Sequence, residues 1–268
     1  MDKKTAVIIT DTVQKELFAL LKAKGFDCEA VDGFRGLCNG NTVYERVILP
    51  FPSKKYKEQI KASDGEIYDS LKSCKLIIGG MLDEETKNAF DKAQIKYLDY
   101  FKSEAYVLKN AYLTTQAALR LLLENTTCFL PGKKVLITGF GRIGKSLALS
   151  LKTLGMKVFV AARREEALAD AKSLGFETFS FSTLPATVFY YDYIFNTVPS
   201  PVFSQKDVTH VRNDATYFEL ASAPFGACEE DFNQSGKNYI FAGGLPGKYY
   251  PAAAAINIAD YIICHGGI

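Results

Sequence analysis

Residues 135–164 read VLITGFGRIGKSLALSLKTLGMKVFVAARR, and this stretch decides the fold of the second half of the chain. An apolar run is followed by G-x-G-x-x-G and then by a segment with helical periodicity. In such a turn the first glycine permits a tight bend, the second lets the backbone approach a pyrophosphate, and the third lets helix pack on strand. Backbone N–H groups at the helix start then face the phosphates. The pattern predicts a dinucleotide-binding turn made of Gly139, Phe140, Gly141, Arg142, Ile143 and Gly144.

The end of the second strand bears on which dinucleotide binds. A NAD site has an acidic residue there, which holds the ribose hydroxyls. This strand ends in Arg163 and Arg164, with no acid at its tip. Two guanidinium groups suit a 2′-phosphate, so we predict NADP rather than NAD. The alternative is that both arginines are solvated residues opening the next helix, with Glu165 and Glu166 as local partners.

A third segment of the same half, YDYIFNTVPSP at 191–201, reads as a strand followed by a proline-containing loop. Ligands of open α/β sheets bind at the carboxyl ends of the strands. We therefore place four further residues at the cofactor: Asn196, Thr197, Val198 and Pro199. A proline-stiffened loop without contact to a ligand is the alternative for each of these side chains.

The whole chain alternates short apolar runs with helix-length amphipathic segments. This alternation is typical of parallel sheets covered by helices. It predicts an α/β fold with two Rossmann-like, doubly wound domains and a cleft between them. In the first half the expected strands are 5–10, 28–32, 46–50, 76–80 and 95–100, and the expected helices are 12–24, 54–61, 64–72 and 84–93.

The domain boundaries follow from changes in this pattern. We expect an N-terminal α/β domain over 1–103 and a linking helix over 104–127, whose apolar residues recur at helical spacing. The Rossmann domain for NAD(P) should occupy 128–248. A final helix at about 249–265 should return to the first domain. Both long helices would cross the cleft.

Composition narrows the class of protein. The 268 residues are 48% apolar and 23% charged, as in a globular domain with ample core. A net charge of +2 gives no reason to expect nucleic acid or an anionic membrane as partner. Six scattered cysteines and only two histidines argue against a metal site. The N-terminus has no signal-like apolar stretch, and we expect a cytoplasmic protein.

Beyond the Rossmann motif, the chain resembles the family of dipicolinate synthase A subunits. The resemblance rests on five stretches: YFKSEAYVLKNAYLTT, VLITGFGRIG with VAARR, FNTVPS, ELASAPFG and AGGLPGKYYPA. It implies an NADP-linked oxidation of a dihydrodipicolinate-type ring to dipicolinate during sporulation. It also implies that the partner is a flavoprotein B subunit.

The resemblance carries over unevenly. The cofactor residues match, and the implied substrate residues are Asn110, Thr114, Gln116, Gly244, Leu245 and Pro246. Three charged positions of the family are lost, because Gln116 stands for a glutamate, Ala223 for an arginine and Ala252 for a lysine. Glutamine hydrogen-bonds but cannot serve as a base at neutral pH. No catalytic residue is therefore assigned.

Two functions remain open from the sequence. The first is an NADP-dependent oxidoreductase that acts on a small molecule in the cleft, as a homo-oligomer. The alternative is a non-catalytic, nucleotide-binding subunit or sensor that keeps the fold and has lost the chemistry. A 2-hydroxyacid dehydrogenase would need a histidine at the nicotinamide, and neither His210 nor His265 is expected to serve.

Overall fold

The computed structural model describes residues 4–37, 42–61, 71 and 73–266. The chain divides into two compact units, which are described separately below. Unit 1 comprises Met1–Asn110 and Pro246–Ile268, and unit 2 comprises Ala111–Leu245. The division falls inside one continuous helix, α5 (Glu104–Glu124).

Unit 1 contains a five-stranded sheet in which every pairing is parallel. The strand order β2-β1-β3-β4-β5 is that of a doubly wound fold, with the change of direction between β1 and β3. The strands are β1 (Thr5–Ile9), β2 (Cys28–Asp32), β3 (Arg46–Ile48), β4 (Leu76–Gly79) and β5 (Tyr97–Asp99).

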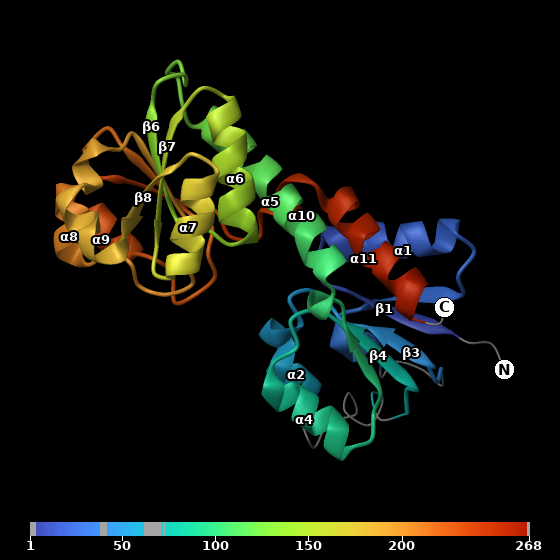
Figure 1. Cartoon of the computed structure of the whole chain (residues 1–268). Coiled ribbons are helices and arrows are strands. Elements are labelled where there is room, and N and C mark those ends of the chain that lie inside the picture. The colour runs from blue at the N-terminus through green and yellow to red at the C-terminus, as the bar shows by residue number, and fades with distance from the viewer. Residues whose placement is uncertain (1–3, 38–41, 62–70, 72, 267–268) are drawn as a thin grey trace. The chain divides into compact units, whose positions relative to one another are not determined.

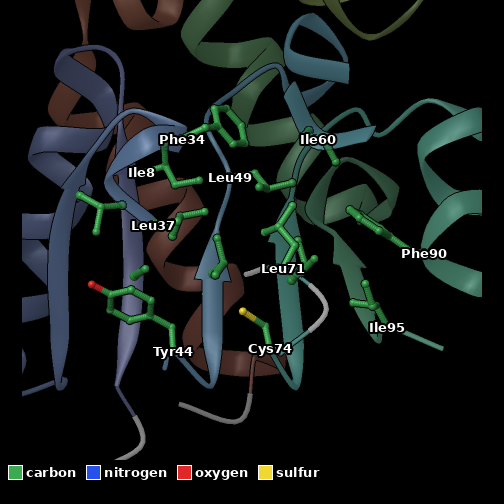
Figure 2. Close-up of a cluster of buried hydrophobic side chains, with 14 of the residues drawn as sticks. Ile8, Phe34, Leu37, Tyr44, Leu49, Ile60, Leu71, Cys74, Phe90 and Ile95 are labelled. Atoms are coloured by element: carbon green, nitrogen blue, oxygen red, sulfur yellow. The ribbon is translucent and has the colours of Figure 1, made fainter. Parts of the chain in front are cut away.

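Helices cover both faces of this sheet (Figure 1). The sheet's alternating side chains face α2 and α4 on one side, where they form the apolar core of Figure 2. On the other side α1 packs against α11. Helix α1 begins where Asp11 accepts hydrogen bonds from the N–H groups of Val13 and Gln14. The helices are α1 (Thr12–Ala23), α2 (Lys57–Lys61), α4 (Glu84–Lys92) and α11 (Pro251–His265).

Unit 2 contains a six-stranded parallel sheet in the order β11-β10-β9-β6-β7-β8. Numbered from β6, this is the 3-2-1-4-5-6 order of dinucleotide-binding folds. The order reverses between β6 and β9, which places a topological switch point there. The strands are β6 (Lys134–Thr138), β7 (Lys157–Ala162), β8 (Glu177–Ser180), β9 (Tyr193–Asn196), β10 (Thr216–Glu219) and β11 (Asn238–Phe241).

The helices of unit 2 also lie on both sides of their sheet. Helices α6 and α7 pack on β6, β7 and β8, while α8 and α9 lie on the other side (Figure 1). They are α6 (Arg142–Thr153), α7 (Glu165–Ser173), α8 (Gln205–His210) and α9 (Glu229–Gln234), with α10 (Leu245–Tyr249) after the last strand. Short 3₁₀ helices occupy Phe34–Leu37, Ser53–Tyr56, Tyr100–Lys102, Phe181–Ala186 and Val188–Tyr190.

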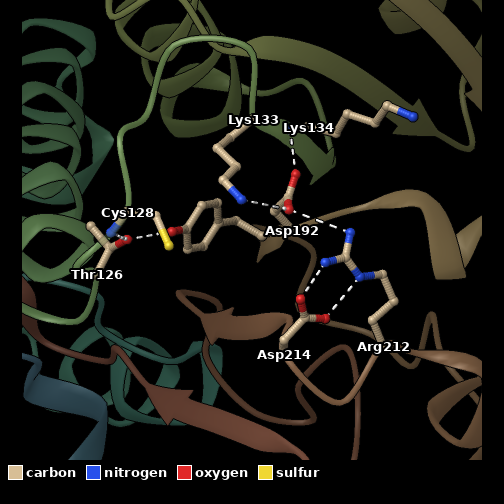
Figure 3. A network of polar contacts seen from close by, with 8 residues as sticks. Thr126, Cys128, Lys133, Lys134, Asp192, Arg212 and Asp214 are labelled. Atoms are coloured by element: carbon tan, nitrogen blue, oxygen red, sulfur yellow. Dashed lines mark hydrogen bonds and ion pairs between the residues drawn. The ribbon is translucent and has the colours of Figure 1, made fainter.

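A polar network joins the amino ends of three strands of unit 2 (Figure 3). The carboxylate of Asp192 accepts hydrogen bonds from the backbone N–H of Lys134 at 2.8 Å and from the Lys133 ammonium at 3.3 Å. Arg212 adds a third contact at 3.4 Å and also pairs with Asp214. Because ligands of open α/β sheets bind at the carboxyl ends of the strands, this network lies at the edge opposite the expected cofactor site.

The predicted fold class, an α/β protein with two Rossmann-like parallel sheets, is confirmed. Strand β8 was missed because its sequence, ETFS, is largely polar. The helix predicted over 54–61 begins as a 3₁₀ turn and is α-helical only over Lys57–Lys61. Most of the helix predicted at 64–72 falls outside the described residues. Among the helices that the structure describes, none is both long and apolar enough to cross a bilayer.

Candidate functional site

The glycine turn after β6 has no room for side chains at two of its positions. Gly139 has φ +91°, and a Cβ there would lie 2.5 Å from the hydroxyl oxygen of Thr197. A Cβ at Gly144 would lie 2.2 Å from the carbonyl oxygen of Gly139. The first position therefore requires glycine for its conformation and the second for its contact with the turn.

Gly141 differs from these two glycines because no atom lies within 4 Å of a Cβ placed on it. It is the exposed N-cap of α6, and no side chain caps the N–H groups that begin this helix. The first turn of α6 also carries no acidic residue. Open backbone donors at the positive end of a helix fit a pyrophosphate. Glycine at this position keeps that approach clear.

The other residues of the turn have separate places. Phe140 is buried, and its ring packs edge-on against Phe176 at 5.9 Å between centroids. Arg142 is exposed and Ile143 is half-buried, both in the first turn of α6. Phe140 thus anchors the turn to the core, while Arg142 lies at the surface beside it.

The loop after β9 lies next to the glycine turn across the switch point. Asn196 pairs in register with Thr138, the residue before Gly139. Thr197 donates two hydrogen bonds to the carbonyl of Thr138, from its N–H at 2.9 Å and from its hydroxyl at 2.8 Å. The structure therefore brings together the two segments that the sequence assigned to one site. Val198 and Pro199 follow in the same loop.

The two arginines that follow β7 are exposed to solvent. Arg163 and Arg164 are both exposed, and Arg164 is the N-cap of α7. Within the described part of the chain, neither side chain forms an ion pair with Glu165 or Glu166, while the exposure of both arginines at the start of α7 fits the alternative of solvated residues that open this helix. The strand tip therefore presents two guanidinium groups to the solvent.

Three polar side chains form a row at the carboxyl edge of the sheet. Thr138, Asn196 and Glu219 end the neighbouring strands β6, β9 and β10 in register, and all three are completely buried. The residues two positions earlier belong to the core on the side of α8 and α9, so the row points to that face. Thr138 donates to the Asn196 Oδ1 at 2.6 Å, and the Asn196 amide donates to Glu219 at 2.6 Å.

Asn196 uses all its hydrogen-bonding capacity inside the protein. Its Oδ1 also accepts from the N–H of Val198 at 3.1 Å, and its Nδ2 also donates to the carbonyl of Val198 at 3.0 Å. An amide has two acceptor and two donor positions, and all four are filled. The side chain of Asn196 thus fixes the loop backbone.

Glu219 was not recognised from the sequence. Its Oε1 accepts from Asn196 and from the N–H of Ala221 at 3.0 Å. Its Oε2 accepts from the hydroxyl of Tyr217 at 3.0 Å and the N–H of Gly226 at 2.8 Å. Burial raises the pKa of this carboxyl, and the four donated hydrogen bonds oppose that rise. The sequence signal for Glu219 is the stretch YFELAS, in which an acidic residue ends an apolar strand.

The implied substrate residues on α5 lie well inside the helix. Helix α5 begins at Glu104, so Asn110, Thr114 and Gln116 all lie after its first turn. Thr114 is buried, Asn110 is half-buried and Gln116 is exposed. Positions four apart share a face, so Asn110 and Thr114 lie in one line along the helix, with Gln116 further round.

The remaining implied substrate residues follow the last strand. Gly244 is exposed with φ +67°, Leu245 is buried, and Pro246 lies in the first turn of α10. The alanines that replace charged residues of the family, Ala223 and Ala252, are both exposed. The two charged residues of the family that these alanines replace would therefore lie at the surface of this chain.

Comparisons with known proteins find a matching family model and a relative for parts of this chain. Residues 124–203 match the family model described as the NAD binding domain of D-isomer specific 2-hydroxyacid dehydrogenases. The A subunit of dipicolinate synthase from Bacillus subtilis (strain 168) is 26% identical over 187 residues, which are 70% of this chain and 63% of that protein. The aligned segment thus spans less than two thirds of that relative.

Two solved structures share the fold over nearly the whole chain. The A subunit of dipicolinate synthase from Bacillus halodurans superposes with a TM-score of 0.83 at 22% identity, covering 98% of this chain and 97% of that one. The corresponding structure from Bacillus subtilis gives 0.79 at 24% identity, covering 98% and 95%. The resemblance seen in the sequence is thereby confirmed: this chain is a relative of the dipicolinate synthase A subunits and contains a NAD(P)-binding domain of the 2-hydroxyacid dehydrogenase kind.

Proposed function

We propose that this chain is an NADP-dependent oxidoreductase of the dipicolinate synthase A type. The observation that carries the proposal is the glycine turn at the switch point of a six-stranded parallel sheet. Gly139 and Gly144 leave no space for a Cβ, while Gly141 leaves the start of α6 open. A turn of this construction suits a dinucleotide, whose bound nicotinamide supplies the hydride chemistry.

NADP is preferred over NAD in this proposal because of the β7 tip. Arg163 and Arg164 are exposed there, and the tip itself has no acid to hold ribose hydroxyls or to repel a phosphate. Glu165 and Glu166 follow in the first turn of α7 and lower the local positive charge. A guanidinium can still give a phosphate two parallel hydrogen bonds, which a carboxylate cannot.

The substrate in this proposal is a small carboxylated molecule. Support comes from the resemblance to dipicolinate synthase A subunits and from Asn110, Thr114 and Gln116 on α5. With Gln116, Ala223 and Ala252 in place of charged residues, the substrate is less anionic than a dihydrodipicolinate, or its turnover is weak. Self-association into a homo-oligomer and pairing with a flavoprotein second subunit are parts of the same proposal.

The second candidate is a nucleotide-binding subunit or sensor without catalysis. The same three substitutions favour it, because they remove groups that would bind carboxylates or move protons. Calorimetric titration with NADP⁺ tests what both candidates share, and absence of binding would exclude both. Reduction of bound NADP⁺ by small carboxylated ring compounds, followed by absorbance, separates them. Turnover with any of these compounds supports the oxidoreductase, and binding without turnover across the set supports the sensor.

A further inference from the structure

The buried carboxylate of Glu219 lies on the nicotinamide half of the proposed cofactor site. The tip of β7 receives the adenosine ribose in this fold, so the nicotinamide half belongs to the side of β9 and β10. Glu219 pairs in register with Asn196, which pairs with Thr138, the residue before the glycine turn. At about 4.8 Å per strand, Glu219 is separated from that turn by roughly 10 Å along the sheet.

The hydrogen bonds favour the ionised form of Glu219 and oppose the burial that raises its pKa. Three of its four donors are N–H groups, from Asn196, Ala221 and Gly226, and an N–H of an amide cannot accept a proton in return. The fourth is the hydroxyl of Tyr217. Each carboxylate oxygen thus accepts two hydrogen bonds, an arrangement that suits the ionised form.

No cation neutralises this charge within the described residues. Glu219 is completely buried, and none of the ion pairs formed by the described lysines and arginines includes it. The four donors spread the charge by hydrogen bonding but leave its sign unchanged. Unit 2 therefore holds a fixed negative charge beneath the carboxyl edge of its sheet.

A fixed anion distinguishes the two redox states of a nicotinamide. The oxidised ring carries a positive charge, and the reduced ring is neutral after it accepts a hydride. Attraction to a buried anion is weakly screened, and it stabilises only the cationic ring. We propose that Glu219 biases the site toward the oxidised cofactor, an inference that rests on the proposed binding of NADP.

The test compares three ligands on the full chain by calorimetry: NADP⁺, NADPH and 2′-phospho-ADP-ribose, which lacks the nicotinamide. In Glu219→Gln the ratio of the NADPH and NADP⁺ dissociation constants should fall by about tenfold, or ~1.4 kcal/mol. Affinity for 2′-phospho-ADP-ribose should be unchanged. Tyr217→Phe is the matched control, because it removes one hydrogen bond but keeps the charge, and its ratio should match the wild type.

The outcomes separate this inference from the function on which it rests. If the wild type binds none of the three ligands, the proposed function fails. If it binds them and Glu219→Gln keeps the wild-type ratio, or weakens all three equally, Glu219 has only a structural role. A measurement on the wild type alone covers the case in which the variant does not fold: tighter binding of NADPH than of NADP⁺ overturns the inference.

Discussion

The amide of Asn196 donates a 2.6 Å hydrogen bond to the carboxylate of Glu219, and neither side chain is exposed to solvent. This bond connects the loop of the switch point to the end of β10. Because the Oδ1 of Asn196 is held by Thr138, the orientation of the amide is fixed from both sides. The backbone around the proposed cofactor site is therefore set by buried polar groups rather than by surface contacts.

We expect NADP⁺ to bind more tightly than NAD⁺ by about 1.4–2.8 kcal/mol, or about tenfold to a hundredfold. Arg163→Ala and Arg164→Ala should each weaken NADP⁺ selectively, because both side chains are exposed and unpaired in the described structure. The preference should shrink as salt is added. Calorimetric titration of both cofactors measures this. Lys157→Ala is the control, because it removes a positive charge at the other end of β7. Equal affinities of the wild type for NADP⁺ and NAD⁺ would contradict the prediction.

Two alanine substitutions in the glycine turn should have different effects. Gly144→Ala places a Cβ 2.2 Å from a backbone oxygen, so it should lower both thermal stability and cofactor affinity. Gly141→Ala meets no atom and has φ −84°, so the fold should be unaffected while affinity falls. Melting temperature and dissociation constant are measured on both variants. Normal NADP⁺ binding by Gly141→Ala would show that no pyrophosphate approaches that position.

Turnover of a dihydrodipicolinate should be poor or absent. Gln116, Ala223 and Ala252 cannot make the charge-assisted hydrogen bonds of the family's residues, and each such bond is worth at most about 1.5–3 kcal/mol, because all three positions are exposed in this chain. Gln116→Glu restores the carboxylate of the family and should raise kcat/KM. Dipicolinate formation by the purified chain, with and without a flavoprotein subunit, is the assay. Efficient formation by the wild type would show that these substitutions matter little.

Which parts of this site could be predicted depends on the range of the interactions. The glycine turn follows from local spacing, so six consecutive residues sufficed to place it. The row of Thr138, Asn196 and Glu219 depends on three strands meeting in register, and these residues are far apart in the chain. Asn196 was expected at the ligand, but a single sequence cannot show that its side chain is fully used within the protein.

Stability should depend on pH through Glu219. Burial raises its folded pKa above the ordinary value of 4.5. At a pH between the unfolded and the folded pKa of Glu219, the folded chain holds a proton that the unfolded chain releases. The free energy of unfolding therefore falls as pH rises through this window. Glu219→Gln has no carboxyl to titrate and therefore lacks this pH dependence. Urea unfolding from about pH 4 to 8 should show the wild type losing unfolding free energy relative to the variant as pH rises. The prediction is contradicted if the unfolding free energy of the wild type stays constant or increases relative to that of the variant.

The network at the amino ends of the strands should affect stability alone. Asp192→Asn weakens contacts to Lys133, Lys134 and Arg212, and we expect it to lose about 1–3 kcal/mol of unfolding free energy. Asp214→Asn is the control, because that carboxylate is largely exposed and its pairing should contribute little. Chemical denaturation measures both. A change in NADP⁺ affinity in Asp192→Asn would mean that this edge is coupled to the opposite one.

The division of the chain also bears on the order in which the protein folds during synthesis. Unit 1 is built from the first and last segments of the chain, and its helix α1 packs against α11. Unit 2 is one uninterrupted stretch, so all its strands are synthesised before α11. Domains fold as units as they emerge. The sheet of unit 1, which is synthesised first, therefore lacks the helix that packs against α1 until every strand of unit 2 has been synthesised.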